Sequence, residues 1–416
     1  GRELPETLEE TIIGGIVLVA VAVATATLLL ADDRGPVSPF PSTEATAQPS
    51  PSPSPTPPQP SATASATVDE GTWPTYGYND ARTRCNPSLT LHPPYRVKWR
   101  FDARDLLEFP PVVERDRLYI NTGHGRVCCL DAATGELVWQ FRTRGKLASS
   151  PTLADGVVYV TSLRGLLFAL DARSGSQLWS LKLDGPSECS PLVWRGMVVL
   201  GDWQGMVYAI DVRSHKVRWK RRTGGKITAS PACAGTKIVI SSYDGHVYCF
   251  TPRGRPVWSF HARRRLVSSD RFYATPAIAY RTVYIGSIGG TIYALDLQTG
   301  HQRWSRPTGG WVYSSPAVWR DFVFEGSYDR TLYALDAATG QVRWRFAAGA
   351  PISGSPTVIN GIVYFSTIQG RSYGLHARSG RVIWSFADGR YTAVTGGRTT
   401  LYLCGGRTLY ALVQKP

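Results

Sequence analysis

The chain has 416 residues and carries 46 Lys and Arg against 31 Asp and Glu, a formal net charge of +15. Such a surplus attracts anionic partners, but no recognisable nucleic-acid-binding motif accompanies it, so we expect no nucleic acid as a partner. The seven cysteines have no spacing that resembles a zinc site. Their odd number leaves at least one free thiol unless a pair forms between chains.

The first predicted element is a membrane span. Residues 1–10 form a short flank with one arginine and four glutamates, and residues 11–31 continue for 21 positions without a charge. That length crosses a bilayer as a helix. A cleaved signal peptide is the alternative, but the basic segment it needs is missing and its apolar stretch would be shorter. We therefore predict an uncleaved single-pass transmembrane helix, whose orientation the lysine and arginine counts do not fix. The start at Gly1 rather than at Met leaves open a further upstream part.

A linker follows the predicted span. Residues 32–70 are rich in Pro, Ser, Thr and Ala, and they include an alternating Pro-Ser run at 49–55. Such a composition cannot build a core, so we expect a disordered, extended stalk. Stalks of this kind are typical of exported heads. We therefore place the domain that follows, residues 71–416, outside the cytoplasm.

Residues 71–416 contain a repeat. Eight tryptophans lie at intervals of 40, 40, 40, 39, 46, 40 and 40 residues. A repeat of about 40 residues is typical of a β-propeller blade with four strands. We interpret the tryptophans as structural wedges between blades, because burial of each indole removes roughly 150–250 Å² from water. They are Trp99, Trp139, Trp179, Trp219, Trp258, Trp304, Trp344 and Trp384.

Other positions keep the same period. An aromatic-Ala-aliphatic-Asp tetrad precedes most of the tryptophans, as at Tyr333–Asp336, and a Ser-Pro or Thr-Pro step recurs in phase with it. A glycine three residues before most of the tetrads marks a tight turn. One repeat is predicted to hold strands at 352–358, 361–367, 371–376 and 381–387.

The two ends of this region are predicted to close a ring. It begins with a lone tryptophan strand, Tyr95–Asp102, and ends with a lone tetrad strand, Thr408–Val413. Pairing of these strands completes an eighth blade and removes an exposed sheet edge. We therefore predict an all-β, eight-bladed propeller of four-stranded antiparallel blades, preceded by one transmembrane helix and a Pro-rich linker.

These motifs resemble a known superfamily. Ala334–Trp344 has the pattern Ala-x-x-x-Thr-Gly-x-x-x-Trp, which is similar to the tryptophan-docking repeat of pyrroloquinoline-quinone (PQQ) type propellers. Trp73–Thr83 resembles the segment before their first blade. The resemblance covers roughly residues 73–416. It implies either a quinoprotein dehydrogenase that uses PQQ and Ca²⁺, or a non-enzymatic protein similar to the BamB outer-membrane assembly lipoprotein.

The residues favour the non-enzymatic branch. Seven of the eight blades have short loops, which leave little material for a cofactor chamber. Candidate calcium ligands on one rim, one per blade, lie in hairpin turns where Asp is mostly a turn former. We therefore assign no catalytic, cofactor-binding or metal-binding residue. These four turn residues are Asn121, Asp202, Asp244 and Asp329.

The adjacent pair Cys128 and Cys129 invites comparison with the vicinal disulfide of some quinoprotein dehydrogenases. Both residues occupy tetrad positions inside a predicted strand, where consecutive side chains point to opposite faces. Cys249 fills the same slot as Cys129 in another blade. We therefore interpret these cysteines as small buried fillers.

Candidate binding residues lie in the predicted hairpin tips and rim connections, where aromatic and arginine side chains have the composition of interface hot spots. Two basic clusters are predicted to lie in connections on one rim, Lys220–Arg222 with Lys226, and Arg263–Arg265 with Arg271. A solvated surface that aids solubility is the alternative for both clusters. The candidates for the binding rim are His124, Trp203, Tyr243, Arg263, Arg264, Arg265, Trp311 and Tyr328.

The function predicted from the sequence is binding rather than catalysis. We expect an extracytoplasmic propeller, anchored in the membrane through residues 11–31, that acts as a protein-binding scaffold at the cell envelope. The basic rim would add an anionic surface or polymer as a partner. The alternatives are a PQQ-dependent quinoprotein oxidoreductase and the sensor ectodomain of a membrane signalling protein such as a Ser/Thr kinase.

Overall fold

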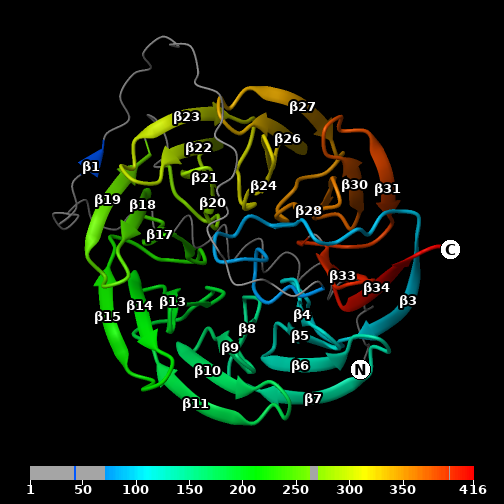
Figure 1. Cartoon of the computed structure of the whole chain (residues 1–416), viewed down its shortest axis with the longest axis horizontal. Helices are drawn as coiled ribbons and strands as arrows, with labels where there is room; N and C mark the ends of the chain where they lie inside the picture. The colour runs from blue at the N-terminus through cyan, green and yellow to red at the C-terminus, as the bar shows by residue number, and fades with distance from the viewer. Residues whose placement is uncertain (1–41, 44–70, 263–269, 393) are drawn as a thin grey trace, which may run out of the picture. The chain divides into compact units, whose positions relative to one another are not determined.

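Eight sheets surround a common axis in the part of the chain that the computed structural model describes, residues 42–43, 71–262, 270–392 and 394–416. Figure 1 looks down this axis, with short strands near the centre and long strands at the periphery. The predicted flank 1–10 and the predicted helix 11–31 lie outside the described residues, as does nearly all of the linker. Within the described residues, no helix is long and apolar enough to cross a bilayer.

Each blade is an antiparallel sheet that runs outward from an inner strand through two middle strands to an outer strand. The inner strands are β4 (Val112–Glu114), β8 (Thr152–Ala154), β12 (Leu192–Trp194), β16 (Ala232–Ala234), β20 (Ala277–Ala279), β24 (Ala317–Trp319), β28 (Thr357–Ile359) and β32 (Thr395–Gly396). The second strands are β5 (Arg117–Asn121), β9 (Val157–Thr161), β13 (Met197–Gly201), β17 (Lys237–Ser241), β21 (Thr282–Gly286), β25 (Phe322–Gly326), β29 (Ile362–Ser366) and β33 (Leu401–Gly405).

The third strands carry the aromatic-Ala-aliphatic tetrads. They are β6 (Arg126–Asp131), β10 (Leu166–Asp171), β14 (Met206–Asp211), β18 (His246–Phe250), β22 (Thr291–Asp296), β26 (Thr331–Asp336), β30 (Ser372–His376) and β34 (Thr408–Gln414). The outer strands carry the tryptophans. They are β3 (Tyr95–Asp102), β7 (Leu137–Arg142), β11 (Gln177–Lys182), β15 (Val217–Arg222), β19 (Pro256–His261), β23 (Gln302–Pro307), β27 (Val342–Ala347) and β31 (Val382–Phe386).

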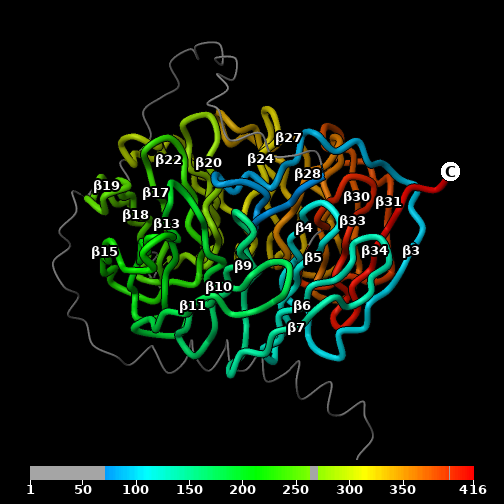
Figure 2. Tube along the Cα trace, turned by 60° about the horizontal axis from the view of Figure 1, so that its bottom comes forward, coloured from blue at the N-terminus to red at the C-terminus, as the bar shows by residue number. Residues whose placement is uncertain are grey.

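The prediction of eight four-stranded blades is confirmed, and so is the closure of the ring. Strand β3 pairs antiparallel with β34, so the eighth blade combines one strand that precedes the repeats with three from the C-terminus. Figure 2 shows β3 beside β34 near the C-terminus. Two further strands, β1 (Ser42–Thr43) and β2 (Cys85–Asn86), pair in parallel with β19 and β28.

One strand boundary predicted from the sequence is wrong. The inner strand expected at 352–358 is confined to β28, Thr357–Ile359, and the residues before it form a loop at the end of the axis. Small residues and prolines limit each inner strand to two or three positions, because a proline cannot donate to the ladder. This leaves eight loops that converge on the axis.

The repeating tryptophans dock on the neighbouring blade. The indole Nε1 of Trp304 donates to the carbonyl of Ala337 at 3.0 Å, and the same bond recurs in five other blades. A Cβ on Gly340 would lie 2.6 Å from the Trp304 ring, which explains why the repeat places glycine there. His215 stands in the equivalent position beside Trp179 and stacks on its ring at 4.8 Å.

Cys128 and Cys129 are free, and both are fully buried. Cys128 packs in the cluster toward the eighth blade, whereas Cys129 packs in the cluster toward the next blade. The alternation of a strand therefore sends the two thiols to opposite sheet faces, as the register predicts. Burial raises the pKa of the Cys129 thiol to about 12, which suits an inert filler.

Hydroxyl groups tie the inner loops of successive blades together. In five blades, the Ser or Thr that precedes the inner proline donates its backbone N–H to the hydroxyl of its counterpart in the next blade. The bonds measure 2.9–3.0 Å and run Ser150 to Ser190, Ser190 to Ser230, Ser230 to Thr275, Thr275 to Ser315 and Ser315 to Ser355. The Ser/Thr-Pro step of the sequence is therefore a structural belt.

The segment 72–86 enters the ring and fills the axis, and we call it the plug (the blue segment at the centre of Figure 1). Its backbone carbonyls accept N–H groups from the middle residue of most inner strands, including those of Val113, Leu153 and Cys233. These donors have no partner within their own sheet, so the plug satisfies them.

Arg82 anchors the plug. Its side chain is fully buried. Its guanidinium donates to the carbonyl of Pro231 at 2.9 Å, to the hydroxyl of Thr75 at 2.6 Å and to the carbonyl of Tyr76. It also donates to the carbonyls of Ser190 and Pro191. One arginine thus joins the plug to two blades.

Candidate functional site

Two sets of loops meet at one end of the ring, the connections from outer to inner strands and the turns between second and third strands. We call this end the mouth face. Four residues before each inner strand, one residue of each connection lies at the end of the axis, and we call this ring of eight the mouth. It consists of Glu108, Ala148, Glu188, Thr228, Tyr273, Tyr313, Ser353 and Tyr391.

The mouth has an acidic side and an aromatic side. Glu108 and Glu188 belong to blades that flank the small Ala148, whereas Tyr273 and Tyr313 come from two adjacent connections further round the ring. Burial, Glu188 and Glu108 all raise the pKa of the Tyr273 phenol well above its usual value. The Tyr273 phenol therefore interacts electrostatically with both carboxyl groups of the acidic side.

The aromatic side continues as an arc across neighbouring loops. Ring centroids are 6.3 Å apart for Tyr243 and Tyr273, 5.3 Å for Tyr273 and Tyr313, and 5.0 Å for Tyr313 and Tyr328. Trp311 ends the arc, 5.9 Å from Tyr328, and is 54% exposed. Partly exposed aromatic rings in contact with one another are typical of binding surfaces.

A lysine sits where the arc meets the acidic side. The Lys226 ammonium lies 3.4 Å from the centroid of the Trp203 ring and 5.7 Å from that of Tyr243. It is 3.7 Å from the Glu188 carboxylate. Burial raises the pKa of Glu188 and lowers that of Lys226, while each charge opposes the shift of the other. Two aromatic faces and one carboxylate thus enclose a cation.

Glu108 has a different environment. Burial raises its pKa to about 7, and the nearby Glu188 adds to the rise. Among the described residues, no side chain or backbone group forms a hydrogen bond or ion pair with its carboxyl group. Glu108 is half-buried, and an acid in such a position without a partner is costly and is a frequent mark of a functional site.

Several buried polar atoms near the mouth also lack partners. They include Oγ1 of Thr228, whereas the Trp203 side chain acts as a donor to Glu188 and lowers its pKa. Below the mouth, Arg84 stacks on the Tyr76 ring at 4.0 Å and leaves Nε and one terminal nitrogen without acceptors. Glu325, fully buried in a slot that holds aliphatic residues in most blades, has one carboxyl oxygen without a donor. Unpaired buried groups are rare in folded proteins, so each of these atoms calls for a physical explanation.

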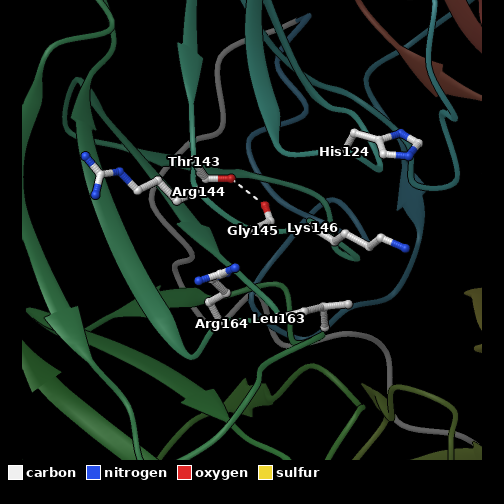
Figure 3. A pocket seen from close by; sticks show the side chains of 7 residues that line it. All are labelled: His124, Thr143, Arg144, Gly145, Lys146, Leu163 and Arg164. Atoms are coloured by element: carbon white, nitrogen blue, oxygen red, sulfur yellow. Dashed lines mark hydrogen bonds between the residues drawn. The ribbon is translucent and has the colours of Figure 1, made fainter.

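A second region of the mouth face is a basic hollow of about 510 Å³ between neighbouring blades. His124, with its side chain 80% exposed, contacts Asp105 through Nδ1 at 2.5 Å. Although burial alone would raise it, hydrogen bonds from Thr122 and His124 hold the pKa of Asp105 below its usual value. Arg144, Lys146 and Arg164 also line the hollow, but Figure 3 shows that their side chains point in different directions.

The structure brings four of the predicted candidates together and separates another. Trp203, Tyr243, Trp311 and Tyr328 all join the arc or its lysine. His124 lies apart, in the basic hollow. The three arginines at 263–265 lie outside the described residues.

The prediction that Lys220–Arg222 lie in a connection is wrong, because all three belong to the outer strand β15. Lys220 pairs with Asp184 at 2.8 Å, and Arg221 donates to the carbonyl of Gly254. Lys226 does lie in the connection. The sequence analysis missed Glu108, Glu188, Tyr273 and Tyr313, although each stands three residues before the inner proline that it used as a marker.

The three aspartates considered as metal ligands have structural partners, whereas the buried Oδ1 of Asn121 has none among the described residues. Asp202 accepts N–H groups from Gln204 and Met206, and Asp244 accepts the Tyr248 hydroxyl at 2.6 Å. Asp329 accepts the hydroxyl of Tyr333 in the same way. Within the described ranges, no group of three His, Cys, Asp or Glu side chains is placed to hold a metal ion.

A family of known proteins matches nearly the whole ring. The model of the family described as outer membrane protein assembly factor BamB matches residues 96–250, 165–311 and 309–415. No curated protein sequence matches the chain.

Solved structures share the fold at low sequence identity. BamB from Moraxella catarrhalis is 19% identical, with a TM-score of 0.68 over 77% of this chain and 100% of that one. A europium-containing methanol dehydrogenase is 13% identical, with a TM-score of 0.71 over 83% of this chain and 98% of that one. A quinohemoprotein alcohol dehydrogenase from Comamonas testosteroni is 14% identical, with a TM-score of 0.74 over 84% and 82%. Identities this low establish the fold alone.

Proposed function

Because this chain belongs to the family of the outer membrane protein assembly factor BamB, we propose that it is a non-enzymatic scaffold whose mouth face binds a partner protein. The observation that carries the proposal is the aromatic arc. Five rings from Tyr243 to Trp311 contact one another in sequence, and the last one is more than half exposed. Rigid aromatic side chains provide much contact area at a low entropic cost.

The placement of this scaffold at the cell envelope is part of the proposal. The uncharged stretch 11–31 and the Pro-rich linker 32–70 support a membrane anchor that holds the propeller outside the cytoplasm. The basic residues at 263–265 would add attraction to an anionic surface or polymer.

Chemical crosslinking in intact membranes, followed by purification of the full chain, tests the proposal. The double variant Trp311→Ala/Tyr328→Ala should recover its partner at least about tenfold less well, because two hot-spot residues are lost. The matched control is Tyr280→Ala, an aromatic residue that is 48% exposed in the turn between β20 and β21, at the opposite end of the ring. Equal recovery of the same proteins by the double variant and the wild type would refute the mouth face as the binding site.

A charge-reversal variant of Arg263, Arg264 and Arg265 tests the basic rim in the same experiment. Loss of an anionic polymer or of lipid with unchanged protein recovery would separate the two partners. Unchanged recovery of both would remove the basic rim from the proposal.

A quinone enzyme is the alternative that the dehydrogenase structures raise. The residues around the axis do not fit the cofactor, because PQQ carries carboxylates and the mouth presents Glu108 and Glu188 to it. The described residues also offer no cluster for the calcium ion. Addition of PQQ and Ca²⁺ to the full chain, with dye reduction by alcohols or aldose sugars as the readout, tests this alternative. Turnover would overturn the scaffold proposal.

A further inference from the structure

The charge of the mouth is opposite to that of the protein. The chain has a net charge of +15, yet the two ionisable groups of the mouth other than tyrosine are carboxyl groups, Glu108 and Glu188. Ala148 lies between them in the ring, so the acidic side has no bulky side chain at its centre. Electropositive surroundings with a local acidic opening select a ligand that is itself positively charged at one point.

The protein shows how such a site holds a cation. The cation is one of the protein's own side chains, Lys226. Its ammonium lies 3.4 Å from the centroid of the Trp203 ring and beside the carboxylate of Glu188. A positive charge over an indole face is stabilised by the ring quadrupole, and more strongly where water is excluded. The Trp203 side chain also acts on Glu188 as a hydrogen-bond donor that lowers its pKa, so it interacts with both members of the pair.

Among the described residues, no cation is paired with Glu108 in this way. The ammonium group of Lys226 pairs with Glu188 and not with Glu108. Burial raises the pKa of Glu108 to about 7, so its ionised form costs stability near neutral pH. Tyr273 and Tyr328 are the other titratable groups that interact with it, and neither supplies a positive charge. An acid whose ionisation costs stability, and which has no partner in the part of the chain that the structure describes, is suited to an external one.

We propose that the mouth is a binding site for one guanidinium or ammonium group, an arginine or lysine side chain presented by the partner protein. Glu108 would receive the charge, with Glu188 beside it, and the faces of Tyr273 and Tyr313 would cover the apolar stem. The proposal rests on the proposed binding function and names the chemistry that the partner must present. Charge complementarity and the Lys226 arrangement select a cationic side chain over an apolar one.

A pair of peptide probes tests the site on the full chain. The first is acetyl-Gly-Arg-Gly-amide, and the second replaces arginine with citrulline, its neutral isostere. We expect the arginine peptide to bind at least about tenfold more tightly by titration calorimetry or ligand-observed NMR, which corresponds to about 1.4 kcal/mol. In the variant Glu108→Gln/Glu188→Gln, the two peptides should bind equally. The matched control Glu136→Gln removes an exposed acid from the turn between β6 and β7, at the other end of the ring, and should keep the preference.

A variant that is expected to bind the arginine peptide more tightly distinguishes a direct effect on binding from a folding defect. Lys226→Met removes the internal cation and frees Glu188, so binding of the arginine peptide should tighten severalfold. Lys220→Met removes an exposed charge of the same sign that pairs with Asp184, and it should have a much smaller effect. A gain of binding cannot come from misfolding. Equal gains in both variants would show general electrostatic attraction and overturn the site.

The outcomes separate this inference from the proposed function. If the wild type recovers its partner through the arc but does not distinguish arginine from citrulline, the cationic site is wrong and the scaffold stands. If the peptides are distinguished but no partner depends on Trp311, the site binds a cation and the proposed function fails. Displacement of the arginine peptide by calcium chloride, at an ionic strength matched with sodium chloride, would assign the acidic side to a metal ion instead.

Discussion

The plug and the mouth lie along one axis, yet they differ in how the charged groups that they hold are hydrogen-bonded. In the plug, Arg82 directs its guanidinium at carbonyls and a hydroxyl that it can reach. At the mouth, Glu108 carries a carboxyl group whose ionisation the surroundings oppose. In the first arrangement, burial lowers the pKa of Arg82 to about 10, but the guanidinium stays charged at neutral pH, and its hydrogen bonds offset the cost of burying that charge. The second costs stability, which a fold retains where a ligand supplies the missing partner.

Hydrogen-bond satisfaction therefore distinguishes the plug from the candidate binding site at the mouth. The distinction is sharp even between neighbours, since Arg84, two residues after Arg82, leaves two nitrogens unpaired beneath the mouth. It also agrees with the aromatic arc, which was located independently of charge.

The strongest way to break the comparison is to remove Arg82. Arg82→Met should lower the free energy of unfolding by about 3–5 kcal/mol, because the carbonyls of Pro231, Ser190 and Pro191 lose their donor in a closed interior. Chemical denaturation of the full chain measures this. Arg84→Met is the control at the other end of the comparison and should change the free energy of unfolding by less than about 1 kcal/mol. Equal decreases in the free energy of unfolding would show that hydrogen-bond satisfaction does not distinguish Arg82 from Arg84.

A smaller and pH-dependent effect is expected at Glu108. Its pKa is raised in the folded protein, so folding is favoured while the group is protonated, and that contribution is lost as the pH rises through about 7. Glu108→Gln, which stays neutral, should therefore be more stable than the wild type at pH 8, by on the order of 2 kcal/mol. The gap should shrink between pH 7 and 4.5 and vanish below that.

Thermal unfolding at a series of pH values checks the sign. Glu136→Gln, an exposed acid, serves as the control and should follow the wild type throughout. A Glu108→Gln variant that is less stable at pH 8 would mean that the carboxylate has a favourable partner, and the contrast with the plug would disappear.

The smallest expected effect concerns a turn on the mouth face. Arg330 has a φ of 73° in the turn between β25 and β26, where most blades place glycine with a positive φ. Arg330→Gly should raise the free energy of unfolding by about 1 kcal/mol, since the left-handed conformation costs a residue with a Cβ roughly that much. Denaturant titration gives the value. Gly370→Arg, the reverse change at φ 83° in the next blade, should lower it by a similar amount.

The sequence predicted the ring well because the information for it is local and repeated. The tryptophan spacing, the tetrads and the turn glycines each act within one blade or between adjacent blades, so their period alone gives eight units. Closure by β3 and β34 also followed from counting, since one strand of each type was left over. The aromatic candidates at hairpin tips were found for the same reason, because a tip is recognisable from its turn residues.

The mouth could not be obtained in this way. Glu108 and Glu188 are 80 positions apart, and each is an ordinary residue in its own loop. Both stand three residues before the inner proline, a position that the repeat makes recognisable. However, nothing in the sequence indicates that this position lies at the axis. The role of Arg82 was equally hidden, because its acceptors are backbone carbonyls from two distant blades.

The amino-acid sequence by itself determined the number of blades, their strand order and the way the ring closes, because short-range periodicity specifies each of them. Only the tertiary structure decided which side chains share the axis, which of their polar groups are hydrogen-bonded and which are not. Those properties depend on dielectric surroundings and on contacts between loops from separate repeats, and both arise when the ring closes.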